Sequence, residues 1–158
     1  MAASTVVSGT RTLVLEETRV TRYVAFAETA GGFTLPDPAR PGGSDLTFEG
    51  FEFPGVIESP SVIFFRTRHT GRPTFSVSLN TASLTIFTFT DADPPERSWH
   101  EIIPADRPGG SPSLQAQNNQ LIFGVTGDGT VTFGDVVIFY TSNELTVKVP
   151  LVITAAKA

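Results

Sequence analysis

The chain has 158 residues and no cysteine, and its 11 Lys and Arg against 16 Asp and Glu give a formal net charge of -5 at pH 7. This length suits one domain with a single hydrophobic core, and the lack of cysteine excludes a disulfide framework and a thiolate metal site. The acidic balance argues against a nucleic-acid partner, which needs a basic surface. We therefore expect one domain over residues 1–158.

The first nine residues, MAASTVVSG, contain neither the basic nor the apolar region of a secretory signal. We expect a protein that is cytoplasmic or exported by a non-classical route, and the sequence leaves its compartment open. Wholly apolar runs such as 62–65 and 136–140 are far shorter than the ~20 residues of a membrane helix. The sequence therefore predicts a soluble chain without a membrane span.

The first half of the chain combines a strand pattern with a region rich in Pro and Gly. Residues 10–27 alternate apolar and polar side chains, which indicates two strands or one long bent strand. Residues 31–60 hold 6 of the 14 glycines and 5 of the 12 prolines, so we expect a loop or arm there. Residues 46–53 are its best hidden strand pair. The phenylalanines of residues 31–60 form either a stacking platform for a sugar ring or a satellite hydrophobic cluster. They are Phe33, Phe48, Phe51 and Phe53.

Strands follow regularly after Pro60, and no window shows a capped helical period. The predicted strands are residues 61–69, 73–80, 84–89, 121–125, 131–140 and 145–153. We expect a turn at 70–73, and the Asp-Gly pair within 126–130 predicts a hairpin between the strands on either side. Pro150 places the last strand at an edge or a bulge. This pattern is typical of an all-β, single-domain antiparallel sandwich or barrel.

Residues 62–140 resemble a known family. The resemblance is carried by Phe75-Ser-Val-Ser-Leu79-Asn80, then Phe87 and Phe89, Trp99-His-Glu-Ile-Ile-Pro104, Leu114, Asn119, and Leu121-Ile-Phe-Gly-Val125. This succession resembles the galactose-binding-domain-like jelly rolls, which include many carbohydrate-binding modules. The resemblance implies a jelly-roll β-sandwich and lectin-like carbohydrate binding. The chain departs from the family with Asn80-Thr81 in place of Asn-Gly, and with Gln117-Asn118-Asn119 in place of Gly-x-Asn.

The same residues have roles that physical chemistry predicts. Asn80, at a strand end, satisfies turn groups or takes a left-handed conformation, and Asn118 can take the left-handed conformation too. Leu114 plugs the bottom of the sandwich, and Asn119 hydrogen-bonds across the loop before the next strand. Asp135 follows Gly134 in an apolar run, so we expect it at a β-bulge or paired, because an unpaired buried carboxylate is costly.

The candidate ligand-binding residues are Arg66, Arg68, His69, Trp99 and His100. The arginines, with Arg72, form the densest basic patch and could clamp sugar hydroxyls or a carboxylate, or could pair with a carboxylate such as Asp135. Trp99 either stacks on a sugar or belongs to the core. Trp99 and Glu101 share one face of a strand and His100 takes the other, so these three cannot converge on one substrate atom. The histidines are general bases or ligands, or structural residues.

Asp91, Asp93 and Asp128 are weak candidates for a structural calcium site of the kind that such jelly rolls carry, and we expect no other cofactor. No motif of the common hydrolase, metalloprotease or nucleotide-binding classes is present, so we do not expect an enzyme. Our first hypothesis is a non-catalytic carbohydrate-binding module. The alternative is a structural or assembly subunit that forms a homo-oligomer or docks on a larger complex; the 13 phenylalanines fit either a large core or a buried interface. A small enzyme is the third.

Overall fold

The computed structural model describes residues 3–8, 11–26, 32–40 and 42–147, which form an all-β structure without a helix. The strands are β1 (Ala3–Ser8), β2 (Arg11–Phe26), β3 (Phe33–Leu35), β4 (Asp45–Phe51), β5 (Ser61–Leu79), β6 (Ala82–Thr88), β7 (Glu96–Ile103) and β8 (Asn119–Val147). They belong to one sheet, and each pairs antiparallel with its neighbours. The predicted all-β antiparallel class is confirmed, while the jelly-roll type stays a prediction.

The long strands β5 and β8 form a ribbon along which the other strands are arranged. They pair from Val62 opposite Phe139 to Leu79 opposite Leu121. On the other edge of β8 lie β2, β3 and β4 in turn, while β7 and β6 pair with the first and second halves of β5. Every other strand except β1, which pairs with β2, is therefore placed by this ribbon.

The ribbon bends in the middle, where glycines of the two strands face each other. Gly71 lies opposite Gly129, and both have positive φ. A Cβ added at Gly129 would lie 1.9 Å from the carbonyl oxygen of Thr70, so the two backbones approach too closely for a side chain. The predicted turn at 70–73 and hairpin at 126–130 are therefore wrong, because β5 and β8 both run through these residues and bend together.

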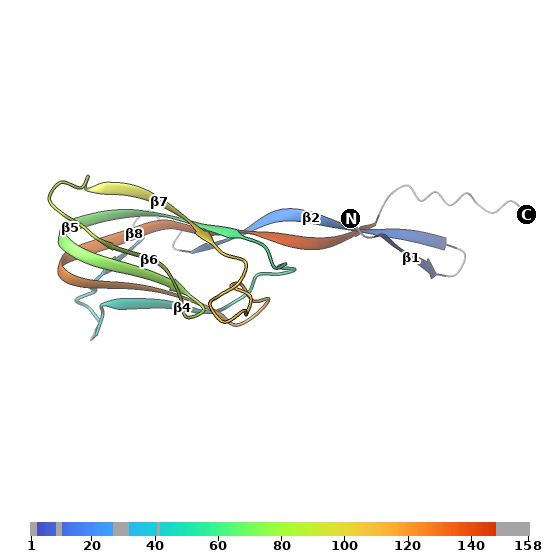
Figure 1. Ribbon diagram of the computed structural model, residues 1–158, viewed down its shortest axis with the longest axis horizontal. Helices are drawn as coiled ribbons and strands as arrows, with labels where there is room; N and C mark the ends of the chain where they lie inside the picture. Colours follow the sequence, from blue (N-terminus) through green and yellow to red (C-terminus); the bar gives the residue numbers. More distant parts are fainter. Residues whose placement is uncertain (1–2, 9–10, 27–31, 41, 148–158) are drawn as a thin grey trace, which may run out of the picture.

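Because both strands bend at the same level, the two halves of the sheet fold over each other into two layers (Figure 1). Inward rings from the two halves meet between the layers. The ring centroids of Phe65 and Phe75 are 5.9 Å apart, and those of Phe123 and Phe133 are 4.8 Å apart. The largest fully buried aromatic residues are Phe53, Phe65, Phe75, Phe89, Phe123 and Phe133. The core is therefore built mainly from phenylalanine, which packs edge to face.

Buried amides close the end of the layers opposite the bend. Asn119 accepts hydrogen bonds at Oδ1 from Asn80 Nδ2 (2.8 Å) and Gln115 N (2.9 Å), and its Nδ2 donates to the carbonyl oxygens of Phe51 (2.9 Å) and Gln115 (2.7 Å). Leu114 is buried in the same core. The hydrogen bonding predicted for Asn119 is confirmed, as are the left-handed conformations of Asn80 (φ 48°) and Asn118 (φ 59°), while a plugging role for Leu114 stays a prediction.

The N-terminal region follows the predicted pattern in part. Residues 11–26 form the single strand β2, whereas residues 45–51 form one strand, β4, in place of the predicted pair. Beyond its last pairing with β5, β8 continues beside β2 to Val147, and Figure 1 shows this ribbon and β1 extending away from the two layers. Of the last predicted strand, residues 145–147 belong to β8, and Pro150 with the other residues from 148 on lies outside the described residues. No helix in the described part of the chain is long and apolar enough to cross a membrane.

The bend gives a first prediction. Gly129→Ala should destabilise the fold by about 2 kcal/mol or more, because its Cβ would collide with the backbone of Thr70 and its φ of 132° disfavours a side chain. Gly134→Ala is the matched control, since a Cβ there meets nothing within 4 Å. Urea unfolding monitored by Trp99 fluorescence measures both. Equal stability of the two variants would contradict the close approach at the bend.

The turn between β5 and β6 gives a second prediction. Leu79 pairs with Ala82, and the intervening Asn80 and Thr81 both have positive φ (48° and 70°), as in a type I′ turn. A β-branched residue is strained there, so Thr81→Gly should raise the unfolding free energy by about 1 kcal/mol. The same change at Thr47, exposed within β4, should lower it. Thermal melting compares the two, and a loss of stability in both variants would argue against strain.

Candidate interaction surface

Strand alternation separates the predicted ligand residues onto two faces. Arg66, Arg68 and His100 are exposed on the outer face of β5 and β7, whereas Trp99 is buried on the inner face. His69 lies on the inner side of β5, where its ring stacks on Phe89 with centroids 3.9 Å apart. The five residues therefore do not form one site.

Trp99 is a core residue with only 6% of its surface exposed. Its indole Nε1 donates to Thr67 Oγ1 at 2.8 Å, and its ring packs edge-on against Phe75 and Phe87, each with centroids 5.0 Å away. The guanidinium of Arg97 lies 4.0 Å from the indole centroid and covers it. Of the two roles predicted for Trp99, the structure therefore shows the core residue. No face of its indole is free for a sugar.

The outer arginines are each paired within the chain. Arg66 contacts Asp135 at 3.2 Å, Arg68 contacts Glu96 at 2.7 Å, and Arg72 contacts Asp91. Asp135 has φ 50° and lies at a shift in the β5–β8 register, so both expectations for it, a bulge and a partner, are confirmed. These pairs are more than half exposed and contribute little to stability. They do, however, occupy the guanidinium groups predicted to clamp a ligand.

Two of the predicted calcium residues, Asp91 and Asp93, have partners within the chain. Arg72 lowers the pKa of Asp91 through a hydrogen bond and its charge. The pKa of Asp93 is lowered mainly by the backbone N–H of Thr90, which donates to its Oδ2 at 2.7 Å. Asp128 lies opposite Arg72 in the β5–β8 ladder. A calcium ion at Asp91 would compete with Arg72, and a structural calcium site at these residues stays a prediction.

One pair of carboxylates is in direct contact. The hydrogen bond and the repulsion between Glu58 and Asp106 raise the pKa of Glu58, and Glu58 is fully exposed. The carboxyl groups of a glycosidase stand at least about 5 Å apart, so that the glycosidic bond fits between them. Glu58 and Asp106 leave no such space. The two groups are therefore closer together than the carboxyl pair that this reaction uses.

Exposed apolar side chains gather on the outer face of the layer formed by β2, β8, β5 and β7. Tyr23 of β2 lies opposite Phe139 of β8, Phe139 opposite Val62 of β5, and Val62 opposite Ile102 of β7. Their exposed fractions are 66%, 42%, 37% and 71% in that order, and they include four of the six exposed large hydrophobic residues in the described chain. The four form one continuous row across four strands.

A second row lies beside the first, two residues away on each strand. Ala25, Val137, Phe64 and His100 are paired in the same order from β2 to β7. Of these, His100 is exposed and the other three are half-buried. We call the eight residues of the two rows the outer band. Threonines 21 and 141 border it on one side, and the Arg66–Asp135 pair borders it on the other.

The outer band was not predicted from the sequence, although a signal was present. Runs 62–65 and 136–140 are apolar at every position, a pattern that also fits strands buried on both faces. In an antiparallel sheet with one face in water, alternate residues of such runs must point outward. The first row alone exposes on the order of 400 Å², which is the size of the largest patch on a typical monomer and often marks a functional surface.

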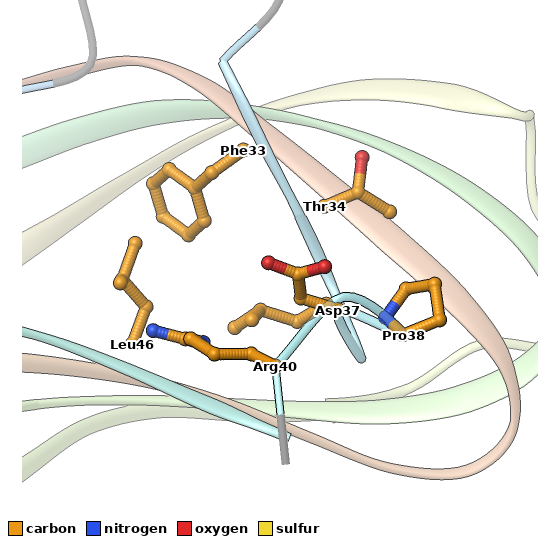
Figure 2. A pocket seen from close by; sticks show the side chains of 7 residues that line it. Phe33, Thr34, Asp37, Pro38, Arg40 and Leu46 are labelled. Carbon is orange, nitrogen blue, oxygen red and sulfur yellow. The ribbon is translucent and has the colours of Figure 1, made fainter. Parts of the chain in front are cut away.

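A pocket of about 260 Å³ lies elsewhere, between β3, the loop after it and the start of β4 (Figure 2). Phe33, Leu35 and Leu46 give it apolar walls, and Asp37 and Arg40 bring opposite charges to it. Asp37 Oδ1 accepts from Ala39 N at 2.9 Å, and Arg40 Nη2 donates to the Asp45 carbonyl at 2.5 Å, so the loop holds both side chains. Phe33 belongs to the predicted stacking platform, whereas Asp37 and Arg40 were not predicted.

Comparison with protein-family models and with curated proteins gave no match to this chain. The resemblance to galactose-binding-domain-like jelly rolls therefore stays a prediction. Two surface features of the described chain could bind a partner or ligand, the outer band and the pocket beside β3.

Proposed function

We propose that this chain is a non-catalytic structural or assembly module that docks on another protein surface through the outer band. One observation carries the proposal: of the six exposed large hydrophobic residues in the part of the chain that the structure describes, four form a single row across four strands. Single exposed apolar residues are ordinary on a monomer, but a contiguous row costs free energy in water unless something covers it. A protein partner would cover this row.

The composition of the outer band supports a protein partner. Tyr and Phe are enriched at the centre of protein interfaces, and Arg is the charged residue most often found with them. Here Tyr23 and Phe139 lie in the row, with ring centroids 6.2 Å apart, and the Arg66 and Arg68 pairs lie beyond it. An apolar centre with a polar border is the ordinary anatomy of a docking face.

Photo-cross-linking tests this function without assuming the partner. A photoreactive amino acid at Ile102, in cells that make the protein, should yield a discrete protein cross-link. The control is Ile86, which is 68% exposed against 71% for Ile102 but lies on β6, away from the outer band. Equal labelling from both positions, or none from Ile102, would count decisively against docking through the band.

A second candidate function is carbohydrate binding at the pocket beside β3. The observation that favours it is that one pocket holds an aromatic ring, Phe33, together with the charged side chains of Asp37 and Arg40. A sugar ring presents apolar C–H groups to an aromatic ring, and its hydroxyls pair well with carboxylate and guanidinium groups.

Asp37→Asn tests this second candidate. The amide keeps the acceptor for Ala39 N but removes the charge, so sugar affinity should fall at least about tenfold, because a hydrogen bond to a charged group contributes about 1.5–3 kcal/mol. Asp135→Asn, on the outer face, is the control and should bind as the wild type does. A glycan array and thermal shifts across a sugar panel provide the measurement. No hits with the wild-type chain on either would exclude the pocket as a sugar site.

A further inference from the structure

We propose that the partner of the outer band is a second copy of this chain, packed face to face about a two-fold axis that runs parallel to the strands between Phe139 and Val62. This inference rests on the proposed function of the band. The contact is isologous, with the same eight residues on each side.

Charge favours a second copy as the occupant. The charges nearest the band are neutralised within each copy, since Arg66 pairs with Asp135 and Arg68 with Glu96. The band therefore offers no unbalanced charge that would select an acidic or basic partner. Two copies that each carry a net charge of -5 would meet through an apolar centre, with no like charges opposed in either row.

The arrangement of rings and aliphatic side chains is self-complementary about this axis. In the first row the rings, Tyr23 and Phe139, stand on β2 and β8, and the aliphatic residues stand on β5 and β7. In the second row the order reverses, with Ala25 and Val137 on β2 and β8, and rings on β5 and β7. A half turn about the proposed axis exchanges β2 with β7 and β8 with β5. Every ring of one copy then faces an aliphatic side chain of the other.

The resulting contacts pair large with small in both rows. Tyr23 faces Ile102 of the second copy, and Phe139 faces its Val62. In the second row, Phe64 faces Val137 of the second copy and His100 faces its Ala25. Ring against aliphatic contact at each point keeps the gap between two packed sheets even, near the usual ~10 Å. An axis perpendicular to the strands and midway between the two rows would also set rings against aliphatic side chains, with Tyr23 facing Ala25 and Phe139 facing Val137 of the second copy. It would place each strand over its own copy, so the two axes differ in which strands meet.

The area that a dimer would cover extends beyond the first row. A standard interface takes about 800 Å² from each partner, and the first row exposes on the order of 400 Å². The half-buried second row, the bordering threonines and the paired arginines surround that centre on the same face and would be covered with it.

Engineered thiols test the axis, because the chain contains no cysteine of its own. Tyr23→Cys and Ile102→Cys are made as separate variants, mixed, and treated with a bifunctional thiol reagent that spans the ~10 Å between packed sheets. The mixture should give a covalent dimer that contains one copy of each variant. Either variant alone should give little, since like positions would be offset by three strand spacings, about 14 Å. Ile86→Cys serves as the control for chance collisions.

Sedimentation velocity on the purified wild-type chain completes the test. We expect a concentration-dependent dimer, a dissociation constant at least about tenfold higher for Ile102→Lys, and no change for Ile86→Lys. Efficient linking of a single variant to itself would overturn the axis. A strictly monomeric wild-type chain would overturn the second copy as partner. The proposed docking function would still stand in that case if Ile102 photo-cross-links to a different protein, and would fail with the dimer if Ile102 gives no cross-link.

Discussion

The close approach of two backbones at Gly129 and Thr70 is the constraint on which the rest of the structure depends. Because Gly71 and Gly129 face each other, β5 and β8 bend at the same level and keep their pairing through the bend. Without this shared bend the sheet would remain a single layer, and inward rings such as Phe65 and Phe123 would not meet at 6.0 Å. The two layers, the phenylalanine core and the identity of the outer face all follow from it.

The same two strands supply both the core and the outer band. Within run 136–140, Val136, Ile138 and Tyr140 point inward and are buried, while Val137 and Phe139 point outward. Run 62–65 divides in the same way. A wholly apolar run at the centre of an antiparallel sheet therefore serves two surfaces. The fold needs only the inner set, so the outer set calls for a separate explanation.

Local features were predictable from the sequence, and features that depend on register were not. Asn80, Asn119 and the bulge at Asp135 follow from nearest-neighbour chemistry, and each has the predicted role. The glycines at 71 and 129 have the same local signature in a bend as in a turn. Only the partner strand, some sixty residues away, decides between the two.

The outer band could not be predicted for the same reason. Its first row joins residues from four strands, and no local pattern reveals how these strands pair. The pocket joins Phe33 to Leu46 across a loop and was missed because its charged residues stand in a Pro- and Gly-rich segment without a pattern.

Strand propensity does not account for the apolar character of the outer band. Thr forms strands about as well as Val or Ile does, and the chain places threonine at many outward positions of the same sheet. In the row next to the band, Thr21 pairs with Thr141. Nearer the bend, the hydroxyls of Thr70 and Thr130 hydrogen-bond at 2.8 Å. A threonine at 23, 62, 102 or 139 would keep the strand and remove exposed apolar surface. The large side chains at these four positions therefore add exposed apolar surface that strand formation does not require, which is the pattern expected where a surface is held against a partner.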